Sequence, residues 1–178
     1  MAGAARAFER CGDDARAKFW AACCRGDPSE DAPIEHLEAL YDGYAQRYDA
    51  HLSETLASRA PALVAESVRG TKAQKALDCG CGTGLSGRAL FDAEACSKLD
   101  GVDLSEAMCE KARSIFSQCY GSEAGVAALK WLPYGGLYVS GGIAAKNPEW
   151  VMGDDFMGAY KDKGRMSNLV MSVPLYLV

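Results

Sequence analysis

Residues 76–87, ALDCGCGTGLSG, limit the possible folds of this chain more than any other stretch. A short apolar strand pattern runs into Gly80, Gly82 and Gly84, and a helical pattern follows. Glycines at this spacing allow a tight turn and let the backbone lie close to a ligand, beside the free N–H groups of a helix start. A disulfide between Cys79 and Cys81 would be strained. The stretch therefore predicts a ligand-binding loop.

A second strand pattern, KLDGVD, follows that helix and ends at Asp103. The next segment, SEAMCEKARSIFSQCY, predicts an amphipathic helix that Ser105 caps. Strand, helix, strand, helix is the order that begins a doubly wound parallel sheet, so the predicted fold class is α/β. An acid at the tip of the second strand is placed to accept hydrogen bonds from the ribose hydroxyls of a nucleoside.

Charge and cysteine usage exclude several classes of function. The 178 residues carry a formal net charge of −5, which gives no electrostatic footprint for nucleic acid or for an anionic membrane. No apolar run approaches a membrane span and no signal core is visible, so we expect a cytoplasmic protein. The eight cysteines form no C-x-x-C pair, which predicts free thiols and no metal site.

The chain before the glycine stretch reads as helical. Residues 2–26 predict two helices, the second capped by Asp13, in a pattern that resembles one helix of a tetratricopeptide repeat; we expect residues 1–33 to form a helical cap. Residues 34–50 predict a helix with a tyrosine stripe, for which core packing is the default interpretation. A further helix is predicted at PALVAESV. The stripe consists of Tyr41, Tyr44 and Tyr48.

The motifs LDCGCGTG and GVDLSEAMCEKAR resemble the first two motifs of class I S-adenosylmethionine-dependent methyltransferases, and the lead-in resembles a subgroup with upstream tetratricopeptide repeats. The resemblance covers about residues 1–120. It implies a methyltransferase with a partial Rossmann-like sheet over residues 34–120, S-adenosyl-L-methionine as cofactor and an acceptor that the sequence does not identify. No residue can be assigned as catalytic. The implied cofactor-binding residues are Asp78, Gly80, Gly82, Gly84, Asp103, Leu104 and Met108, with Tyr41, Tyr44 and Tyr48 folded over them.

The chain after residue 120 departs from that pattern. GGLYVSGGIAAKNPEW, DDFMGAYKDKGRMS and VPLYLV resemble the C-terminal end of bacterial-type glucokinases, which have the hexokinase–actin architecture. This resemblance covers about residues 124–178. It implies that Gly141 and Gly142 lie against the adenosine of ATP. The catalytic aspartate and the glucose-binding residues of such kinases have no match in this sequence.

The two resemblances predict a methyltransferase-like domain joined to a glucokinase-like C-terminal fragment, residues 121–178. Two functional alternatives stay open: a glucokinase-family fragment that uses ATP, and a non-catalytic nucleotide-binding remnant. A competing fold hypothesis keeps one family throughout. In it, WVMGDD forms a third strand that brings Asp154 to the adenine, and NLVMSVPLYLV forms a fourth strand.

Overall fold

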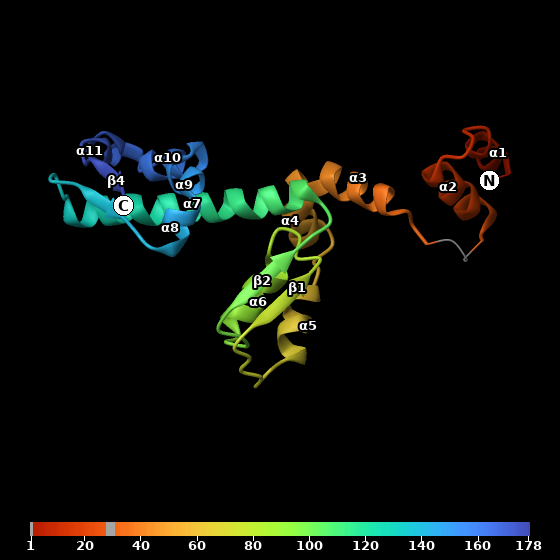
Figure 1. Cartoon of the computed structure of the whole chain (residues 1–178), viewed down its shortest axis with the longest axis horizontal. Helices are drawn as coiled ribbons and strands as arrows, with labels where there is room; N and C mark the ends of the chain where they lie inside the picture. The colour runs from red at the N-terminus through yellow and green to blue at the C-terminus, as the bar shows by residue number, and fades with distance from the viewer. Residues whose placement is uncertain (1, 28–30) are drawn as a thin grey trace. The chain divides into compact units, whose positions relative to one another are not determined.

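The computed structural model describes residues 2–27 and 31–178. The chain is a mixed α/β protein, rich in helices, with two small parallel sheets (Figure 1). Its residues divide into two compact units, Met1–Cys109 and Glu110–Val178, and the division falls inside one helix, α7 (Glu106–Trp131). The α/β class predicted from the sequence is therefore confirmed. The predicted domain boundaries at residues 33 and 120 stay a prediction.

The first unit begins with two helices that contact each other, α1 (Ala2–Glu9) and α2 (Ala15–Arg25). Asp14, not Asp13, is the N-cap of α2, because its carboxylate accepts a hydrogen bond from Ala17 N at 2.8 Å. Asp13 instead forms an ion pair with Lys18. The prediction of two helices is confirmed, and the predicted cap is off by one residue.

A helical segment and a short helix come next. The elements are α3 (Ile34–Tyr44), the 3₁₀ turn η1 (Ala45–Arg47), α4 (Tyr48–Ala50), the π-helical turn η2 (His51–Thr55) and α5 (Ala60–Ser67). Pro61 stands in the first turn of α5, where its missing N–H costs no hydrogen bond.

The glycine stretch joins a strand to a helix, as the sequence predicts. β1 (Ala76–Cys79) leads through the loop into α6 (Leu85–Asp92), and β2 (Leu99–Val102) returns parallel to β1. Ala76 pairs with Leu99 and Cys79 with Val102, so Asp103 follows the paired end of β2. In the described chain this sheet has two strands, and α5 packs against α6 (Figure 1).

The second unit consists of the larger part of α7 and the elements that follow it. These are β3 (Leu137–Val139), α8 (Gly142–Lys146), α9 (Pro148–Met152), α10 (Asp154–Lys161), the 3₁₀ turn η3 (Gly164–Met166), α11 (Ser167–Met171) and β4 (Leu175–Leu177). β3 and β4 form a separate parallel sheet, with Leu137 opposite Leu175 and Val139 opposite Leu177. Figure 1 shows the helices of this unit gathered along the C-terminal part of α7.

The core of the second unit is fully closed. Phe156, Val151 and Val170 have no exposed surface, and the cluster around them draws on α7, β3, α8, α9, α10 and α11. A row of ring contacts crosses this core, with centroids 5.6–6.4 Å apart. The row runs in the order Trp150, Phe116, Tyr120, Phe156, Tyr160.

The single-family hypothesis for the fold is wrong in its secondary structure. The predicted third strand WVMGDD is helical, because Trp150–Met152 belong to α9 and Asp154 begins α10. The first four residues of the predicted fourth strand, 168–171, lie in α11, and only Leu175–Leu177 form a strand, β4, which pairs with β3. Asp154 therefore stands at the start of a helix and not at the tip of a strand.

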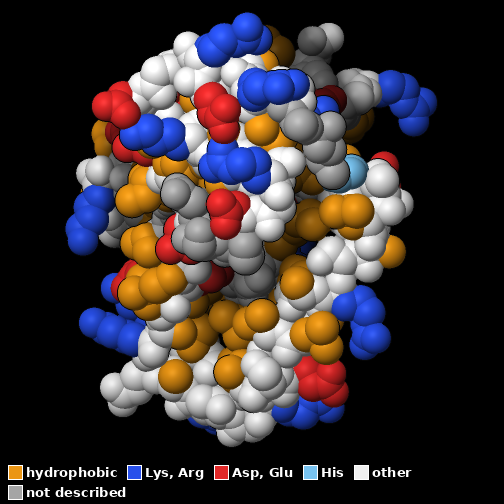
Figure 2. Space-filling view, turned by 90° about the vertical axis from the view of Figure 1, so that its right-hand side faces the viewer, with side chains coloured by type: hydrophobic (Ala, Val, Ile, Leu, Met, Phe, Trp, Pro, Cys, Tyr) orange, Lys and Arg blue, Asp and Glu red, His pale blue; other side chains and the backbone are white. Residues whose placement is uncertain are grey.

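The first unit leaves much apolar surface uncovered. Leu77 is 61% exposed and Val102 51%, although both belong to the parallel sheet. Figure 2 shows hydrophobic side chains reaching the surface in several places between charged ones. Within the described residues, no helix combines the length and the apolar character that crossing a membrane requires.

Candidate functional site

The loop after β1 is held by its own hydrogen bonds. Gly80, Gly82 and Gly84 have φ angles of 80°, 53° and 96°, a backbone region that side chains other than glycine rarely occupy. Asp103 closes the loop: its Oδ2 accepts a hydrogen bond from Gly82 N at 2.7 Å. Its Oδ1 accepts one from Ser105 N at 2.8 Å. Both carboxylate oxygens of Asp103 are thus engaged by backbone.

Residues that precede the sheet in the sequence contact this loop. The ring of Tyr48 lies beside Gly82. A Cβ atom added to Gly82 would be 3.7 Å from Cε1 of that ring. The hydroxyl of Thr83 donates to Asp49 Oδ1 at 2.5 Å. Tyr44 contacts Tyr48 edge to face and shares a hydrogen bond with Nδ1 of His51. Burial raises the pKa of Tyr48, with the nearby Tyr41 and Tyr44 as smaller causes, so its hydroxyl stays protonated at neutral pH.

The other residues predicted at this site are less well placed. Met108 is 1% exposed, so it packs inside the unit, whereas Leu104 is 50% exposed and Tyr41 39%. Asp78 sits in β1 with its Oδ2 buried, and no hydrogen-bond partner for that atom is found in the described chain. The structure brings together Gly82, Asp103 and Tyr48, and it buries the side chain of Met108.

The cysteine thiols are free, as the sequence predicts for all eight. Among the described residues no group of acids, histidines and cysteines is arranged to hold a metal ion. Burial raises the pKa of the Cys81 thiol to about 11, with Cys109, Asp103 and Asp78 adding to the effect. The thiolate is the nucleophilic form, so the raised pKa lowers the reactivity of Cys81 at neutral pH.

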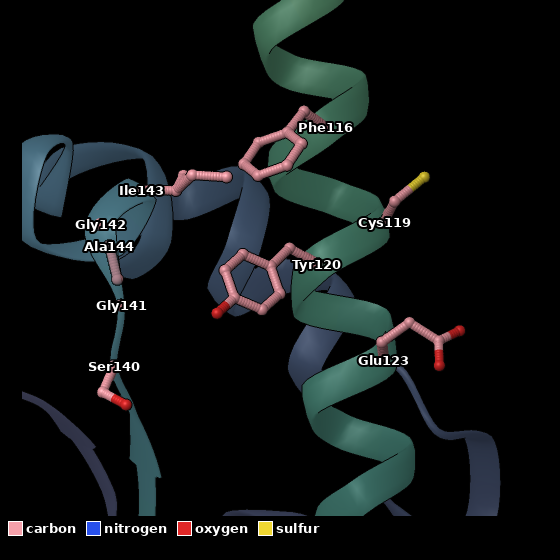
Figure 3. A pocket seen from close by; sticks show the side chains of 9 residues that line it. All are labelled: Phe116, Cys119, Tyr120, Glu123, Ser140, Gly141, Gly142, Ile143 and Ala144. Carbon is pink, nitrogen blue, oxygen red and sulfur yellow. The ribbon is translucent and has the colours of Figure 1, made fainter. Parts of the chain in front are cut away.

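A pocket of about 430 Å³ lies in the second unit, between α7 and the turn that joins β3 to α8 (Figure 3). Four of its residues stand on one face of α7 at positions i, i+3, i+4 and i+7. Figure 3 shows the rings of Phe116 and Tyr120 directed toward the turn. The lining consists of Phe116, Cys119, Tyr120, Glu123, Ser140, Gly141, Gly142, Ile143 and Ala144.

The two predicted glycines of this turn both line the pocket. Gly141 has φ 117° and ψ 171°, so its backbone explains why it is glycine. Gly142 begins α8, has no such φ angle, and a Cβ added to it would meet no atom within 4 Å. Neither backbone strain nor packing within the protein requires glycine there. A ligand that lies against the Cα of Gly142 would require glycine at this position.

Most of the pocket lining was missed from the sequence. Phe116, Tyr120 and Ile143 supply its apolar surface, and Glu123 and Ser140 supply exposed oxygen atoms. Phe116 and Tyr120 belong to the segment that the sequence predicts as an amphipathic helix. The sequence held no signal that this helix meets the turn after β3.

Comparison with known proteins identifies the family. The sequence model of the glucokinase family matches residues 86–178, just over half of the 178-residue chain. The glucokinase of Nostoc sp. is 42% identical over 77 residues, 43% of this chain and 22% of that protein. The glucokinase of Synechocystis sp. is 44% identical over 80 residues, 45% of this chain and 22% of that protein. The glucokinase of Yersinia enterocolitica is 34% identical over 70 residues, 39% of this chain and 22% of that protein.

The chain therefore belongs to the glucokinase family. It spans about a fifth of the length of these curated relatives. No solved structure matches it.

The methyltransferase function, and S-adenosyl-L-methionine as cofactor, are wrong. The family match begins at residue 86 and takes in Asp103, Leu104 and Met108, which the methyltransferase resemblance had claimed. The physical reason for the error is that a strand-to-helix turn with positive φ angles selects glycine whatever lies beside it. Asp103 also has a structural role, because its carboxylate accepts hydrogen bonds from the backbone N–H groups of Gly82 and Ser105. That the loop residues bind a ligand stays a prediction.

Proposed function

We propose that residues 110–178 form the adenosine side of the ATP site of a glucokinase, an enzyme that transfers a phosphoryl group from ATP to glucose. The proposal includes the hexokinase–actin architecture for the complete kinase and a cytoplasmic location. The observation that carries it is Gly142, a glycine that no contact within the protein requires and that lines the pocket between α7 and α8.

The pocket has the chemistry that an adenosine needs. A purine is flat and apolar on its faces, and Phe116, Tyr120 and Ile143 offer apolar surface on opposite sides of the pocket (Figure 3). Ribose hydroxyls need hydrogen-bond acceptors, and the carboxylate of Glu123 and the hydroxyl of Ser140 stand at the same pocket. A volume of about 430 Å³ falls in the range of small-molecule sites.

The test is a calorimetric titration of the full chain with ATP, ADP and adenosine. Substitution of Gly142→Leu puts a side chain into the pocket, and we expect it to weaken the affinity for all three by at least about tenfold, since the ligand loses its place. Gly158→Leu is the matched control: Gly158 lies on α10, outside the pocket, with open space around its Cβ position. Equal affinities of the two variants and the unsubstituted chain would refute the proposal.

Binding and catalysis are separated by a second measurement. Phosphoryl transfer depends on groups that position both substrates and stabilise the transferred charge. Formation of glucose 6-phosphate from ATP and glucose, followed on the same protein, distinguishes an active kinase from a nucleotide-binding protein. ATP binding without product would support the non-catalytic alternative.

A further inference from the structure

The pocket between α7 and α8 has an apolar end and a polar end. α7 passes the pocket in the direction from Phe116 to Glu123, and the opposite wall runs the other way, from Ser140 to Ile143 (Figure 3). Phe116 therefore faces Ile143 at one end, and neither side chain carries a hydrogen-bonding group. The side-chain oxygen atoms of the lining belong to the other end, on Tyr120, Glu123 and Ser140.

Tyr120 carries a hydroxyl that the protein itself does not use. Its ring packs against Phe116 at a centroid distance of 5.8 Å and edge to face against Phe156 at 5.6 Å, so these contacts fix the ring. The hydroxyl points into the pocket (Figure 3), and no hydrogen bond joins it to another described residue. Tyr160, the next tyrosine in the row of rings, instead donates its hydroxyl to Val170 O at 3.4 Å. A phenylalanine at position 120 would serve the packing equally well, so the Tyr120 hydroxyl is available to a ligand.

The two ends of the pocket match the two parts of a nucleoside. The faces of a purine are apolar, and Phe116 and Ile143 offer them contact without a group that hydrogen-bonds to the edge of the base. Ribose carries hydroxyl groups, and Tyr120 and Ser140 meet them with hydroxyls that can both donate and accept.

This division of the pocket determines which ligands it can distinguish. A site that hydrogen-bonds to a hydroxyl rejects the analogue that lacks it, whereas an apolar surface distinguishes poorly between ligands of similar shape. We infer that this site selects its nucleotide by the ribose, through the hydroxyl of Tyr120, and discriminates little between purine bases. The inference rests on the proposed function, because it concerns the specificity of the same pocket.

Calorimetric titration of the full chain with four nucleotides tests this selectivity. ATP, ITP and GTP share the ribose and differ at the edge of the base, whereas 2′,3′-dideoxy-ATP keeps adenine and lacks both ribose hydroxyls. We expect the affinities for ATP, ITP and GTP to lie within about threefold of one another. The affinity for 2′,3′-dideoxy-ATP should be about threefold to tenfold lower than that for ATP, the usual effect of one lost hydrogen bond.

The substitution Tyr120→Phe tests the hydroxyl apart from the ring. It removes one oxygen atom and keeps the ring contacts with Phe116 and Phe156, so we expect the affinity for ATP to fall about threefold to tenfold. The affinity for 2′,3′-dideoxy-ATP should not change, because that ligand has no ribose hydroxyl to pair with Tyr120. Tyr138→Phe is the matched control, since Tyr138 is 61% exposed on β3 and does not line the pocket.

A second variant at the polar end keeps the test independent of how Tyr120→Phe folds. Ser140→Ala removes the other hydroxyl, and it should likewise weaken ATP binding more than 2′,3′-dideoxy-ATP binding. Circular dichroism of each variant shows whether the helices are kept.

Three results would overturn this inference while a loss of ATP affinity in Gly142→Leu still supported the proposed function. They are equal affinities for ATP and 2′,3′-dideoxy-ATP, an ATP affinity that Tyr120→Phe leaves unchanged, and an affinity for ATP more than about tenfold above those for ITP and GTP. An equal loss of affinity for ATP and 2′,3′-dideoxy-ATP in Tyr120→Phe would also overturn it, since the hydroxyl would then not act on the ribose. Absence of binding by every nucleotide would refute the proposed function, and this inference with it.

Discussion

The glycines of this chain stand in two different surroundings, which the space around each Cα distinguishes. Gly142 faces open space in a pocket, whereas Gly121 and Gly125 on α7 face neighbouring backbone. A Cβ on Gly121 would lie 2.1 Å from Phe156 O, and one on Gly125 would lie 2.5 Å from Tyr160 O. The two glycines, one helical turn apart, therefore allow α10 to approach α7 closely.

Substitution of Gly121→Ala should destabilise the second unit. The added methyl group collides with the Phe156 carbonyl, and overpacking of this kind costs about 1–3 kcal/mol. Gly158→Ala, in open space on α10, should instead stabilise by about 0.5–1 kcal/mol through helix propensity. Urea unfolding measures both, and equal effects of the two substitutions would contradict the close approach.

Cys81 should resist alkylation near neutral pH. Its thiol pKa is raised to about 11, chiefly by burial, so almost no thiolate exists at pH 8. Labelling by iodoacetamide at pH 8, read by peptide mass spectrometry, should modify the exposed Cys11 and Cys23 and leave Cys81 largely free. Labelling of Cys81 should increase only as the pH approaches 11. Rapid modification at pH 8 would show that the thiol is not buried in solution.

At the scale of helices and strands, the sequence predicts the elements that carry local signals. It does not predict which distant segments pack or pair. β1, α6, β2 and the start of α7 follow from strand-to-helix alternation and from the Ser105 cap, whose Oγ accepts from Met108 N at 3.2 Å. The helix that Ser105 was predicted to cap continues past residue 120, because residues 106–131 form one helix. The reason for Gly121 and Gly125 in this helix is visible only in the structure, where the backbone of α10 lies against them.

The residues of the candidate site were predicted only in part. Gly141 and Gly142 were named through the resemblance of VSGGIA to glucokinases, and both line the pocket. Phe116 and Tyr120 were read only as residues of an amphipathic helix, because their distance from residues 140–144 is set by tertiary packing. The parallel pairing of β3 with β4 was equally invisible, since these strands are three residues long and separated by several helices.

The start of α7 is held from another element, and this contact is testable. Asp42 of α3 accepts hydrogen bonds from Ser105 Oγ at 2.5 Å and from Ala107 N at 3.3 Å. Asp42→Ala should lower the free energy of unfolding by about 0.5–2 kcal/mol, the usual cost of a lost cap. Glu38→Ala, an exposed acid of the same helix, should change it little. Thermal unfolding of the two variants compares them; matching melting temperatures would argue against the Asp42 contact.

At the scale of the whole molecule, the two units differ in how completely they bury their apolar residues. The second unit closes around Val151, Phe156 and Val170, each with no exposed surface. The sheet of the first unit leaves Leu77 and Val102 more than half exposed. Apolar burial is the main favourable term in folding, so the second unit should be the more stable.

Hydrogen exchange of the intact chain tests this difference. We expect backbone amides of α10 to exchange more slowly than those of β1 and β2, because opening the second unit exposes a closed core. Added urea should release the two groups of amides in separate steps. Equal protection, lost together in one transition, would mean that residues 1–178 fold as a single cooperative domain.

The row of ring contacts in the second unit affects the fluorescence of the protein. Trp150 stands at its end, with Arg113 over its face and Phe116 against its edge. The other two tryptophans, Trp20 and Trp131, are 40% and 73% exposed, so solvent dominates their emission. Any movement of that guanidinium or of the Phe116 ring changes the electric field on the Trp150 indole. The fluorescence of one native side chain thus reports how α9 packs against α7, without any attached dye.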